Sequence, residues 1–507
     1  MVTNGIIDGH TIAVIAAFVI YLGGMIIIGL RKSKNTESSN DFFLGARSTG
    51  PWVTALSAEA SDMSGWLLMG LPGVAYLGGM KEAFWTAIGL IVGTYLNWLF
   101  VAKRLRKYTI HSGDSITIPE FFTNRFKDKS RSLSLVSVIF ILIFFTIYAA
   151  SGFKACADLF HAVFSIPYVW ALLLGIAVIL AYTIMGGYLA VCSTDFVQGT
   201  LMFIALTITS ILGIASLGGP SMAVAKIGSN FLNPFYSNPE APFTIMQIIS
   251  ALGWGLGYFG MPHILIRFMG LRSNRDASIS RRIAMVWVII AFAGALIVGS
   301  AGKAYLTTPL APGEQETVFV AAIIQMFPAF IAGIFLCAIL AAAMSTADSQ
   351  LLVAASAFSR DIYKSFLNKN AGEKQMLLMS RVTVIVVALI AFFIALNPNS
   401  SIFGLVSYAW AGFGATFGPL VLLSLFWKSA TRNGALAGII AGGITVITWK
   451  QITPSMISAS WGNIFNLYEI IPGFIVCFVV AVIVSLLDRP ANAEVIAEYE
   501  AYEKLGD

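Results

Sequence analysis

The chain has 507 residues, of which 58% are hydrophobic and only 11% are charged, and its formal net charge is +6. Ordinary soluble domains carry roughly 25% charged residues, so a water-soluble globular protein of this size is excluded. Apolar stretches of about 20 residues, the length that crosses a bilayer, recur along almost the whole chain. They indicate a single integral membrane body.

The first apolar segment is too long for the core of a signal peptide, and it ends at Arg31 and Lys32 without a small-residue cleavage site. We expect it to be retained as a helix. The full set of apolar runs predicts an all-α membrane protein with about thirteen transmembrane helices. Their approximate ranges are 10–30, 50–75, 80–102, 132–157, 167–187, 194–216, 243–263, 283–303, 328–358, 377–396, 402–426, 434–453 and 468–487.

The basic residues gather on one side of this predicted bundle. Of the 31 lysines and arginines, 26 fall in alternate connections and in the C-terminal tail. Basic connections stay on the cytoplasmic side, so we predict a multi-pass protein of the cell inner (plasma) membrane with its N-terminus outside and its C-terminus inside. The stretches counted as inward-facing are 31–47, 103–131, 267–282, 360–381, 428–432 and the tail from 489.

No stretch of the sequence is typical of an enzyme. There is no G-x-x-x-x-G-K-[ST] motif to bind ATP phosphates, and the four cysteines are scattered singly without metal-ligand or disulfide spacing. We therefore expect a transporter that is driven by an ion gradient or is passive.

Two predicted segments contain residues that break helices in mid-membrane. The second segment carries Ser61, Asp62, Ser64 and Gly65, and the seventh reads G-W-G-L-G-Y-F-G-M-P from residue 253. Transporters built from inverted repeats bind solutes where such helices unwind, and the two segments lie five helices apart, as an inverted repeat requires. The alternative is that the glycines only allow close helix packing.

This pattern predicts a five-plus-five inverted-repeat core with broken helices 2 and 7. The predicted parts are an N-terminal helix and loop (1–49), a first repeat (50–216), an extracellular loop (217–242), a second repeat (243–426), two further helices (427–487) and a cytoplasmic tail (488–507).

Carboxylates at bilayer depth need a cation, a hydrogen-bonded partner or water. Within the predicted spans the candidates are Glu59, Asp62, Asp195 and Asp348. Asp62 stands at the first break, where it could receive Na⁺ or cap the unwound backbone.

The ninth segment holds a second oxygen-rich run. Helical spacing places Ser345, Asp348 and Ser349 on one face, with Thr346 beside them. Serines in membrane helices often bond back to their own helix, but hydroxyls and free carbonyls are also the hard donors that Na⁺ prefers.

Four aromatic residues, Trp66, Tyr148, Trp254 and Tyr258, are the candidates for a solute pocket. Transmembrane tryptophans and tyrosines also form interfacial belts, and that alternative stays open here. A pocket would stack against an apolar ring while helix ends bind a carboxylate. It needs no basic side chain, which favours a small zwitterion.

With these residues identified, the sequence resembles the sodium/solute symporter family, and within it the bacterial sodium/proline symporters. The resemblance runs over nearly the whole chain. It is carried by the stretches F-L-G-A-R-S-T-G-P, T-A-L-S-A-E-A-S-D-M-S-G-W-L-L-M-G-L-P-G, G-W-G-L-G-Y-F-G-M-P-H-I-L, A-I-L-A-A-A-M-S-T and L-V-S-Y-A-W-A-G-F-G-A-T-F-G-P.

The resemblance implies a symporter that imports L-proline with Na⁺ as the coupling ion, by alternating access in the lipid bilayer. It implies that Na⁺ is held by the carbonyls of Ala60, Met63 and Ala342 and the hydroxyls of Ser345 and Thr346, with Asp62 needed for high affinity. The residues that it implies around proline are Trp66, Tyr148, Trp254, Tyr258 and the Pro262 region, with Ser64 and Gly65 beside Asp62.

The sequence departs from this pattern at Glu59, where a glycine is expected. Asp195, Asp348 and Ser349 also occupy positions similar to a second sodium site of distant family members, so a second cation or a proton is a further hypothesis. The rival solutes are another amino acid, pantothenate or a sugar, and the rival class is a channel.

Overall fold

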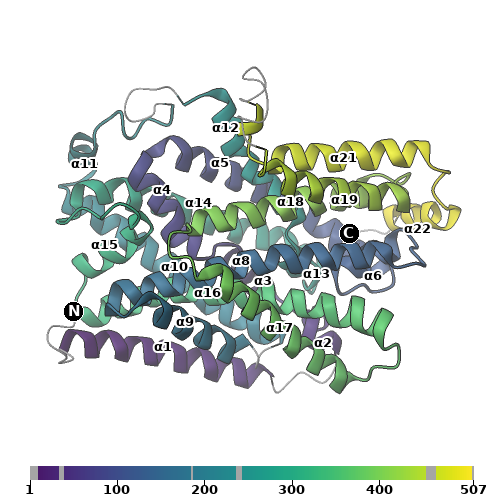
Figure 1. Cartoon of the computed structure of the whole chain (residues 1–507), viewed down its shortest axis with the longest axis horizontal. Helices are drawn as coiled ribbons and strands as arrows, with labels where there is room; N and C mark the ends of the chain where they lie inside the picture. The colour runs from purple at the N-terminus through teal and green to yellow at the C-terminus, as the bar shows by residue number, and fades with distance from the viewer. Residues whose placement is uncertain (1–8, 34–38, 184–186, 236–242, 453–463, 505–507) are drawn as a thin grey trace.

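The computed structural model describes residues 9–33, 39–183, 187–235, 243–452 and 464–504. Within these ranges the chain forms helices and turns without a strand, and one isolated backbone pairing joins Thr49 to Leu271. Most helices run side by side along the long axis of the molecule (Figure 1). The all-α prediction is confirmed. Residues 236–242 of the predicted loop 217–242 and both chain ends lie outside the described residues.

The helices that make up the spans follow the predicted segments. In the first half they are α1 (Gly9–Ser33), α3 (Pro51–Asp62), α4 (Leu71–Gly78), α5 (Met80–Leu96), α6 (Ala102–His111), α8 (Ser132–Phe164), α9 (Tyr168–Thr183) and α10 (Tyr188–Ser216). In the second half they are α12 (Ile245–Leu252), α13 (Pro262–Met269), α14 (Asn274–Tyr305), α16 (Ala329–Ser356), α17 (Glu373–Ala395), α18 (Ile402–Phe426), α19 (Arg432–Trp449) and α21 (Ile470–Leu487).

Shorter helices connect or interrupt these spans. Separate short helices are α2 (Ser39–Leu44), η1 (Gly45–Arg47), α7 (Ile118–Arg125), α11 (Pro220–Ile227), η5 (Gln315–Thr317), α15 (Val318–Met326), η8 (Ile464–Asn466) and α22 (Ala493–Lys504). Wider π turns form η2 (Trp66–Gly70), η3 (Asn97–Val101) and η6 (Ala357–Leu367), and a tighter 3₁₀ turn forms η4 (Gly253–Gly260).

Nine spans among the described residues are long and apolar enough to cross a membrane, or ten if the bent pair Ile245–Gly260 and Pro262–Met269 counts as one. The three remaining predicted segments correspond to the broken pair α3 and α4, to α9 and to α19. The count of thirteen stays a prediction. The described chain starts with α1 at the left of Figure 1 and finishes with α22 at the right, so its two ends lie at opposite ends of the bundle.

The two predicted repeats contain the same series of helices. Each begins with a broken helix, α3 to α4 in the first and α12 to α13 in the second, and continues with four further spans. The order is α5–α6, α8, α9 and α10 in the first repeat, and α14, α16, α17 and α18 in the second.

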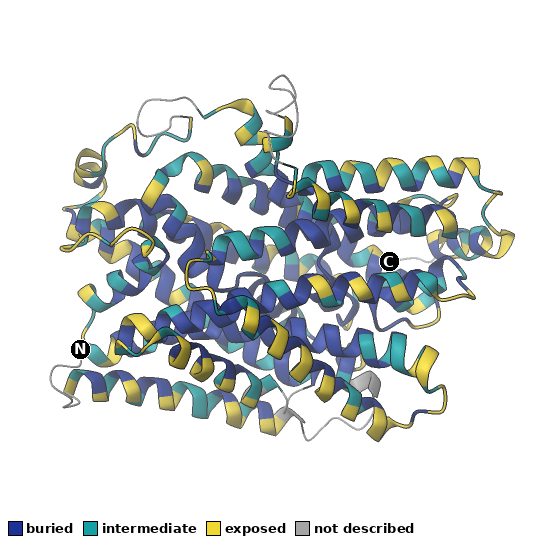
Figure 2. Ribbon diagram, viewed as in Figure 1, coloured by how far each residue is buried: buried dark blue, intermediate teal, exposed yellow. Residues whose placement is uncertain are grey.

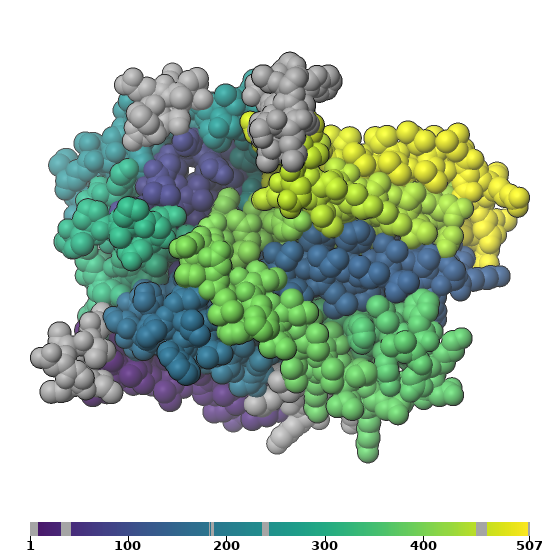
Figure 3. Space-filling model, in the orientation of Figure 1, coloured from purple at the N-terminus to yellow at the C-terminus, as the bar shows by residue number. Residues whose placement is uncertain are grey.

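The most buried helices lie at the centre of the bundle. Figure 2 shows dark blue ribbons in the middle and alternating buried and exposed residues on the outer helices α1, α17 and α21. On the face seen in Figure 3, the blue α8 lies between the green α17 and the yellow-green α19, and it packs against both. The broken helix α3 packs inside this layer against α10, α14, α13 and α16.

A carboxylate outside the spans fixes the start of α18. The two oxygens of Glu316 accept hydrogen bonds from the backbone amides of Ile402 at 2.9 Å and Phe403 at 3.0 Å. Burial raises the pKa of the Glu316 carboxyl, and the two amides oppose that shift. This cap holds Phe403 in place beside Trp254, with ring centroids 5.0 Å apart.

Candidate functional site

The first broken helix ends at Asp62. The last bond of α3 joins the Met63 amide to the Glu59 carbonyl at 2.7 Å, and Met63 then leaves helical geometry at φ −80° and ψ 68°. The Ser64 amide bonds to the Asp62 carbonyl at 2.9 Å instead of reaching back four residues. The Ala60 carbonyl is thereby released from the helical ladder. The predicted break in the second segment is confirmed.

The released carbonyl faces two hydroxyls of α16. Ser345 Oγ donates to the Ala60 carbonyl at 2.7 Å, and Thr346 Oγ1 does so at 3.5 Å. Ser345 Oγ also lies 3.3 Å from the Ala342 carbonyl. The structure thus brings together four of the five oxygen donors expected for sodium. Within the described residues, no hydrogen bond links the fifth, the Met63 carbonyl, to this group.

Asp62 links the two breaks. Tyr258 in η4 donates its hydroxyl proton to Asp62 Oδ2 at 2.6 Å. The Asp62 carbonyl accepts from Tyr148 Oη at 3.3 Å and from Trp66 Nε1 at 3.2 Å. The other carboxylate oxygen, Oδ1, is buried and has no hydrogen-bond partner among the described residues. A buried carboxylate oxygen without a donor is suited to a cation.

Glu59 lies one turn before Asp62 on α3 and is also buried. Trp98 Nε1 donates to Glu59 Oε1 at 3.2 Å, while Glu59 Oε2 has no hydrogen-bond partner in the part of the chain that the structure describes. Two carboxylates with unpaired oxygens therefore stand on neighbouring turns of the same helix.

The second break is a change of helix type followed by a bend. The 3₁₀ turn η4 ends where Met261 is extended, at φ −79° and ψ 106°, and α13 starts at Pro262 with a 46° bend. Glycine is required within η4, because a Cβ on Gly257 would lie 1.9 Å from Trp410 Nε1. The predicted break in the seventh segment is confirmed, and the Pro262 region lies at the start of the second half-helix.

The predicted aromatic side chains gather around the two breaks. Trp66 and Trp254 lie 5.8 Å apart between ring centroids, and both are almost fully buried. Tyr148 and Tyr258 are buried as well. These four residues therefore line the protein interior and do not form an interfacial belt.

Three further aromatic residues join this group without having been predicted. Trp254 has its ring 5.4 Å from that of Tyr468 and 5.0 Å from that of Phe403. Trp410 Nε1 donates to the Trp254 carbonyl at 2.7 Å. A cavity of about 240 Å³ lies against Trp254, Phe403 and Tyr468. Nothing in the local sequence distinguishes these aromatic residues from lipid-facing ones, apart from the position of Trp410 within a conspicuous motif.

Ser64 and Gly65 form the short link between α3 and η2. The Trp66 amide lies 3.5 Å from Ser64 Oγ. A Cβ on Gly65 would lie 2.6 Å from the Cβ of Ala155 in α8, so a larger residue would separate the two helices. The pair thus sets how closely the break packs against α8.

The residues predicted for a second cation surround an arginine. The Arg267 guanidinium donates to Asp195 Oδ2 at 3.1 Å, to Ser349 Oγ at 2.5 Å and to Ser61 Oγ at 3.0 Å. The Arg267 and Asp195 side chains are both 0% exposed. Ser349 Oγ also lies 3.3 Å from Asp348 Oδ1, which connects the last predicted member.

Arg267 therefore corrects one detail of the charge analysis. The charge pattern predicts that Arg267 lies in the inward-facing connection 267–282, but in the structure it lies inside α13, completely buried. The sequence did contain a signal, because the apolar run of the seventh segment continues past His263 through Ile264, Leu265 and Ile266. A helix extended over that run would have placed the arginine within the membrane.

The broken helices meet again at the end of the bundle where the predicted inward-facing connections lie. Thr49, just before α3, bonds to the Gly270 carbonyl after α13 through its amide at 3.2 Å and its hydroxyl at 2.7 Å. Arg47 Nη1 donates to the Met269 carbonyl at 2.7 Å, and its other nitrogens reach Asp114. This inner joint, Arg47 to Thr49 with Met269 to Leu271, holds the two helices together.

Comparison with known proteins shows which family the chain belongs to. The model of the sodium:solute symporter family matches residues 42–442. The chain belongs to this family. Its family is therefore one of membrane transporters.

Among its relatives, the sodium/proline symporter of Escherichia coli is 48% identical over 484 residues, which is 94% of each chain. The sodium/proline symporter of Haemophilus influenzae is 44% identical over 96% of this chain and 97% of its own length. The high-affinity proline transporter of Bacillus subtilis is 45% identical over 94% of this chain and 99% of its own length.

Solved structures agree on the fold. A substrate-bound, outward-open Na⁺-coupled sialic acid symporter superposes with a TM-score of 0.77 at 21% identity, over 95% of this chain and 99% of that one. MhsT in complex with L-phenylalanine gives 0.54 at 15% identity, over 85% and 98%. The fold is the five-plus-five inverted repeat with two broken helices that the sequence predicts.

Proposed function

We propose that this chain is a secondary active symporter of the inner membrane that imports L-proline together with Na⁺ by alternating access, with its N-terminus outside and its C-terminus in the cytoplasm. The proline transporters among its relatives support the solute. The hydrogen bond from Tyr258 to Asp62, 2.6 Å long, carries the proposal. It joins the two broken helices two residues after Ala60, whose carbonyl faces Ser345.

The sodium site in this proposal consists of the carbonyls of Ala60, Met63 and Ala342 and the hydroxyls of Ser345 and Thr346. Each hydroxyl oxygen has lone pairs as well as a proton, so it can coordinate a cation through a lone pair when its O–H bond rotates away. Asp62, directly before Met63, supplies negative charge through a carboxylate oxygen to which no described residue donates a hydrogen bond.

The proline site in this proposal lies between the breaks. Trp66, Tyr148, Trp254 and Tyr258 provide apolar faces for the pyrrolidine ring. The Pro262 region supplies the N-terminal end of α13, whose dipole favours the proline carboxylate. Ser64 and Gly65 are the backbone link beside Asp62.

In this proposal, Na⁺ and proline binding are coupled because Asp62 belongs to both the sodium site and the proline site. Sodium near Ala60 fixes the end of α3, and the Asp62 carbonyl then holds Trp66 and Tyr148 in position. By linkage, sodium and proline raise each other's affinity by the same factor. At −100 mV each entering charge contributes about 2.3 kcal/mol before any concentration gradient is counted.

The contacts support an outward-facing state. The inner joint closes one end of the two broken helices, while the 240 Å³ cavity against Trp254 is lined from the opposite end by Phe243 and Gln247. Inward release of both cargoes requires the inner joint to open as the repeats move past each other.

We infer that Arg267 supplies the positive charge at the predicted second cation site. Its guanidinium already bonds to Asp195 and Ser349, so a second Na⁺ would have to displace it. A single coupling sodium is the simplest stoichiometry for this arrangement.

The test is uptake of labelled L-proline into proteoliposomes that contain the purified chain. We expect uptake when Na⁺ is high outside, and none when a choline gradient replaces it. Uptake that is indifferent to Na⁺ and to protons would refute coupling. A competition panel of other amino acids, pantothenate and sugars decides the solute, and single-channel conductance would assign the chain to the rival class.

A further inference from the structure

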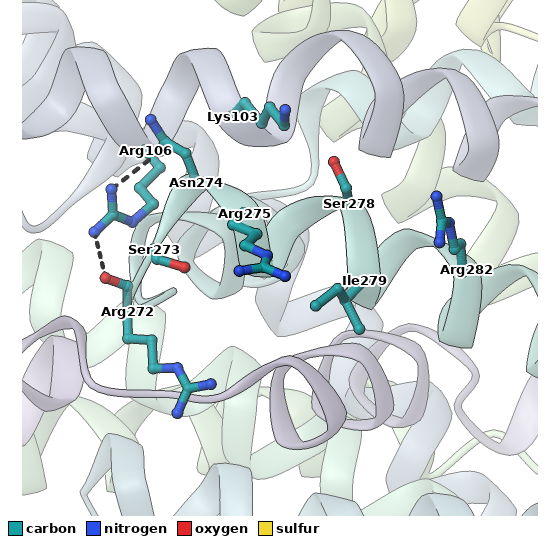
Figure 4. A pocket seen from close by; sticks show the side chains of 9 residues that line it. All are labelled: Lys103, Arg106, Arg272, Ser273, Asn274, Arg275, Ser278, Ile279 and Arg282. Carbon is teal, nitrogen blue, oxygen red and sulfur yellow. Dashed lines mark hydrogen bonds between the residues drawn. The ribbon is translucent and has the colours of Figure 1, made fainter. Parts of the chain in front are cut away.

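A cavity of about 810 Å³ at the inner end of the bundle is lined by five basic side chains, Lys103, Arg106, Arg272, Arg275 and Arg282 (Figure 4). Ser273, Asn274, Ser278 and Ile279 complete its lining, which among the described residues contains no carboxylate. The cavity is built from α6 and from the first turns of α14, far along the chain from each other. Five positive side chains this close together repel one another, and an anion bound between them would offset that repulsion.

The charges in this cavity are only partly balanced by the protein. Arg272 Nε pairs with Asp276 at 2.6 Å. Among the described residues, Arg106 donates to uncharged oxygens alone, the carbonyls of Leu271 at 2.6 Å and Arg272 at 2.8 Å and the Asn274 side chain at 3.0 Å. In the described part of the chain, Arg275 and Arg282 form no ion pair, and both are exposed.

The long helix α14 also begins at this cavity. Ser273 caps it by accepting from the Asp276 amide at 3.2 Å, and residues of its first turn line the cavity. The positive end of the helix dipole therefore adds to the five side-chain charges. Both features favour an anion with several oxygen acceptors, such as a phosphate group.

The surface beside the cavity is suited to acyl chains. Arg275, Ile279, Arg282 and Val286 follow one another on one face of α14 at helical spacing, and Figure 4 shows the first three along the cavity edge. Val286 is 60% exposed, and Ile290, one turn further on, is 37% exposed. A cationic cavity thus continues directly into a bare apolar helix face.

We propose that this cavity binds the phosphate headgroup of an anionic membrane lipid, whose acyl chains lie along the exposed face of α14. The cavity lies among the connections predicted to face the cytoplasm, where anionic lipids attract basic residues. This proposal does not depend on which solute the protein carries.

The bound lipid would also stabilise the inner joint. Arg106 holds the carbonyls of Leu271 and Arg272, and Leu271 pairs with Thr49 across the two broken helices. A headgroup that neutralises Arg106 and Arg272 strengthens this wall of the cavity. Anionic lipid therefore favours the state in which the inner end is closed.

The matched control is a second basic cavity of the described chain, lined in part by α7 and η6. It has a volume of about 680 Å³ and includes Lys364 and Lys369, but its lining also contains Glu120 and Asp361. Those carboxylates balance part of the positive charge in the control cavity. Replacing its two lysines by glutamine changes the net charge of the protein by the same amount as replacing Arg275 and Arg282, and it leaves the proposed site intact.

The experiment titrates the purified full-length protein in detergent with dioleoylphosphatidylglycerol, with dioleoylphosphatidylcholine and with inorganic phosphate, and follows adducts by native mass spectrometry. We expect the first phosphatidylglycerol to bind about tenfold more tightly than phosphatidylcholine. The Arg275→Gln/Arg282→Gln variant should lose most of that preference. Lys364→Gln/Lys369→Gln and the charge-conserving Arg275→Lys/Arg282→Lys should keep it within about twofold.

Equal phosphatidylglycerol binding by the Arg275→Gln/Arg282→Gln variant would overturn the proposal, as would an equal loss in the Lys364→Gln/Lys369→Gln control. Inorganic phosphate that binds as tightly as phosphatidylglycerol would replace the lipid with a soluble anion and also overturn it. The unfolding temperature without lipid reports whether each variant is folded. If the double glutamine variant is not folded, the single Arg282→Gln variant carries the same test, because the Arg282 side chain is exposed and forms no ion pair with any described residue.

Discussion

Two polar groups join α3 to α16, about one helical turn apart, and they differ in the source of their positive charge. Around Ser349, an arginine of the protein itself pairs with Asp195. Around Ser345, the partners are carbonyls, and no basic side chain of the described residues bonds to them. Oxygen-rich sites in a membrane interior need a cation. The group around Ser349 therefore has its cation supplied by the protein, whereas the group around Ser345 can take a cation from solution.

The largest effect should come from removing the internal cation. Arg267→Gln leaves Asp195 buried without its charge partner, and we expect a loss of about 3 kcal/mol in the free energy of unfolding. Thermal or denaturant unfolding of the purified protein measures it. The double variant Asp195→Asn/Arg267→Gln should recover part of the loss, because neither charge is then left alone. Parent-like stability in Arg267→Gln would show that the pair contributes little.

The next effect concerns the carboxylate beside the open group. Asp62→Asn keeps an oxygen acceptor for Tyr258 and removes the charge, so the Na⁺ concentration for half-maximal proline uptake should rise about 10- to 100-fold. Uptake over a range of Na⁺ concentrations at fixed membrane potential measures it, and the unfolding temperature is the control for folding. An unchanged Na⁺ requirement would remove Asp62 from the sodium site.

The sharpest form of the comparison uses two serines of α16. Ser345→Ala removes a proposed sodium donor and should raise the half-saturating Na⁺ concentration about 5- to 10-fold. Ser349→Ala, one turn further on, should change it by less than about twofold, because Arg267 still bonds to Asp195 directly and through Ser57 and Ser61. The same shift in both variants would contradict the division between the two groups.

The smallest effect is expected in the aromatic pocket. Trp254→Phe reduces the aromatic area that can stack against proline, so it should raise the KM for proline about 3- to 10-fold. The Na⁺ dependence at saturating proline should change little. Trp170→Phe is the matched control, because Trp170 is 67% exposed on the outer helix α9. A change confined to Na⁺ dependence would instead assign Trp254 to the ion site.

The candidate site was predictable where local chemistry departs from an apolar background. Asp62 with its flanking serines and the glycines of η4 marked both breaks, and the Ser345–Thr346 pair marked the donors on α16. The roles that the resemblance implies for sodium and proline stay predictions. Glu59 was noticed as a departure, but its contact with Trp98 depends on a neighbouring helix that no local pattern identifies.

The aromatic partners and the arginine were not predictable in the same way. In a water-soluble protein, helical periodicity separates buried from exposed faces, but lipid is as apolar as a protein interior. Trp410 and Tyr468 therefore look like any other aromatic residues of apolar segments. Their contacts with Trp254 depend on how α18 and the chain before α21 pack against η4.

Composition and local backbone chemistry are enough to predict from the sequence that the protein lies in a membrane, where its helices break and which oxygen donors stand near the breaks. The pairing of Arg267 with Asp195, 72 positions earlier in the chain, and the contact of the Ala60 carbonyl with Ser345 depend on how distant helices pack. The reason is geometric, because a buried charged group finds a protein partner only when the helix faces packed around it place one within reach.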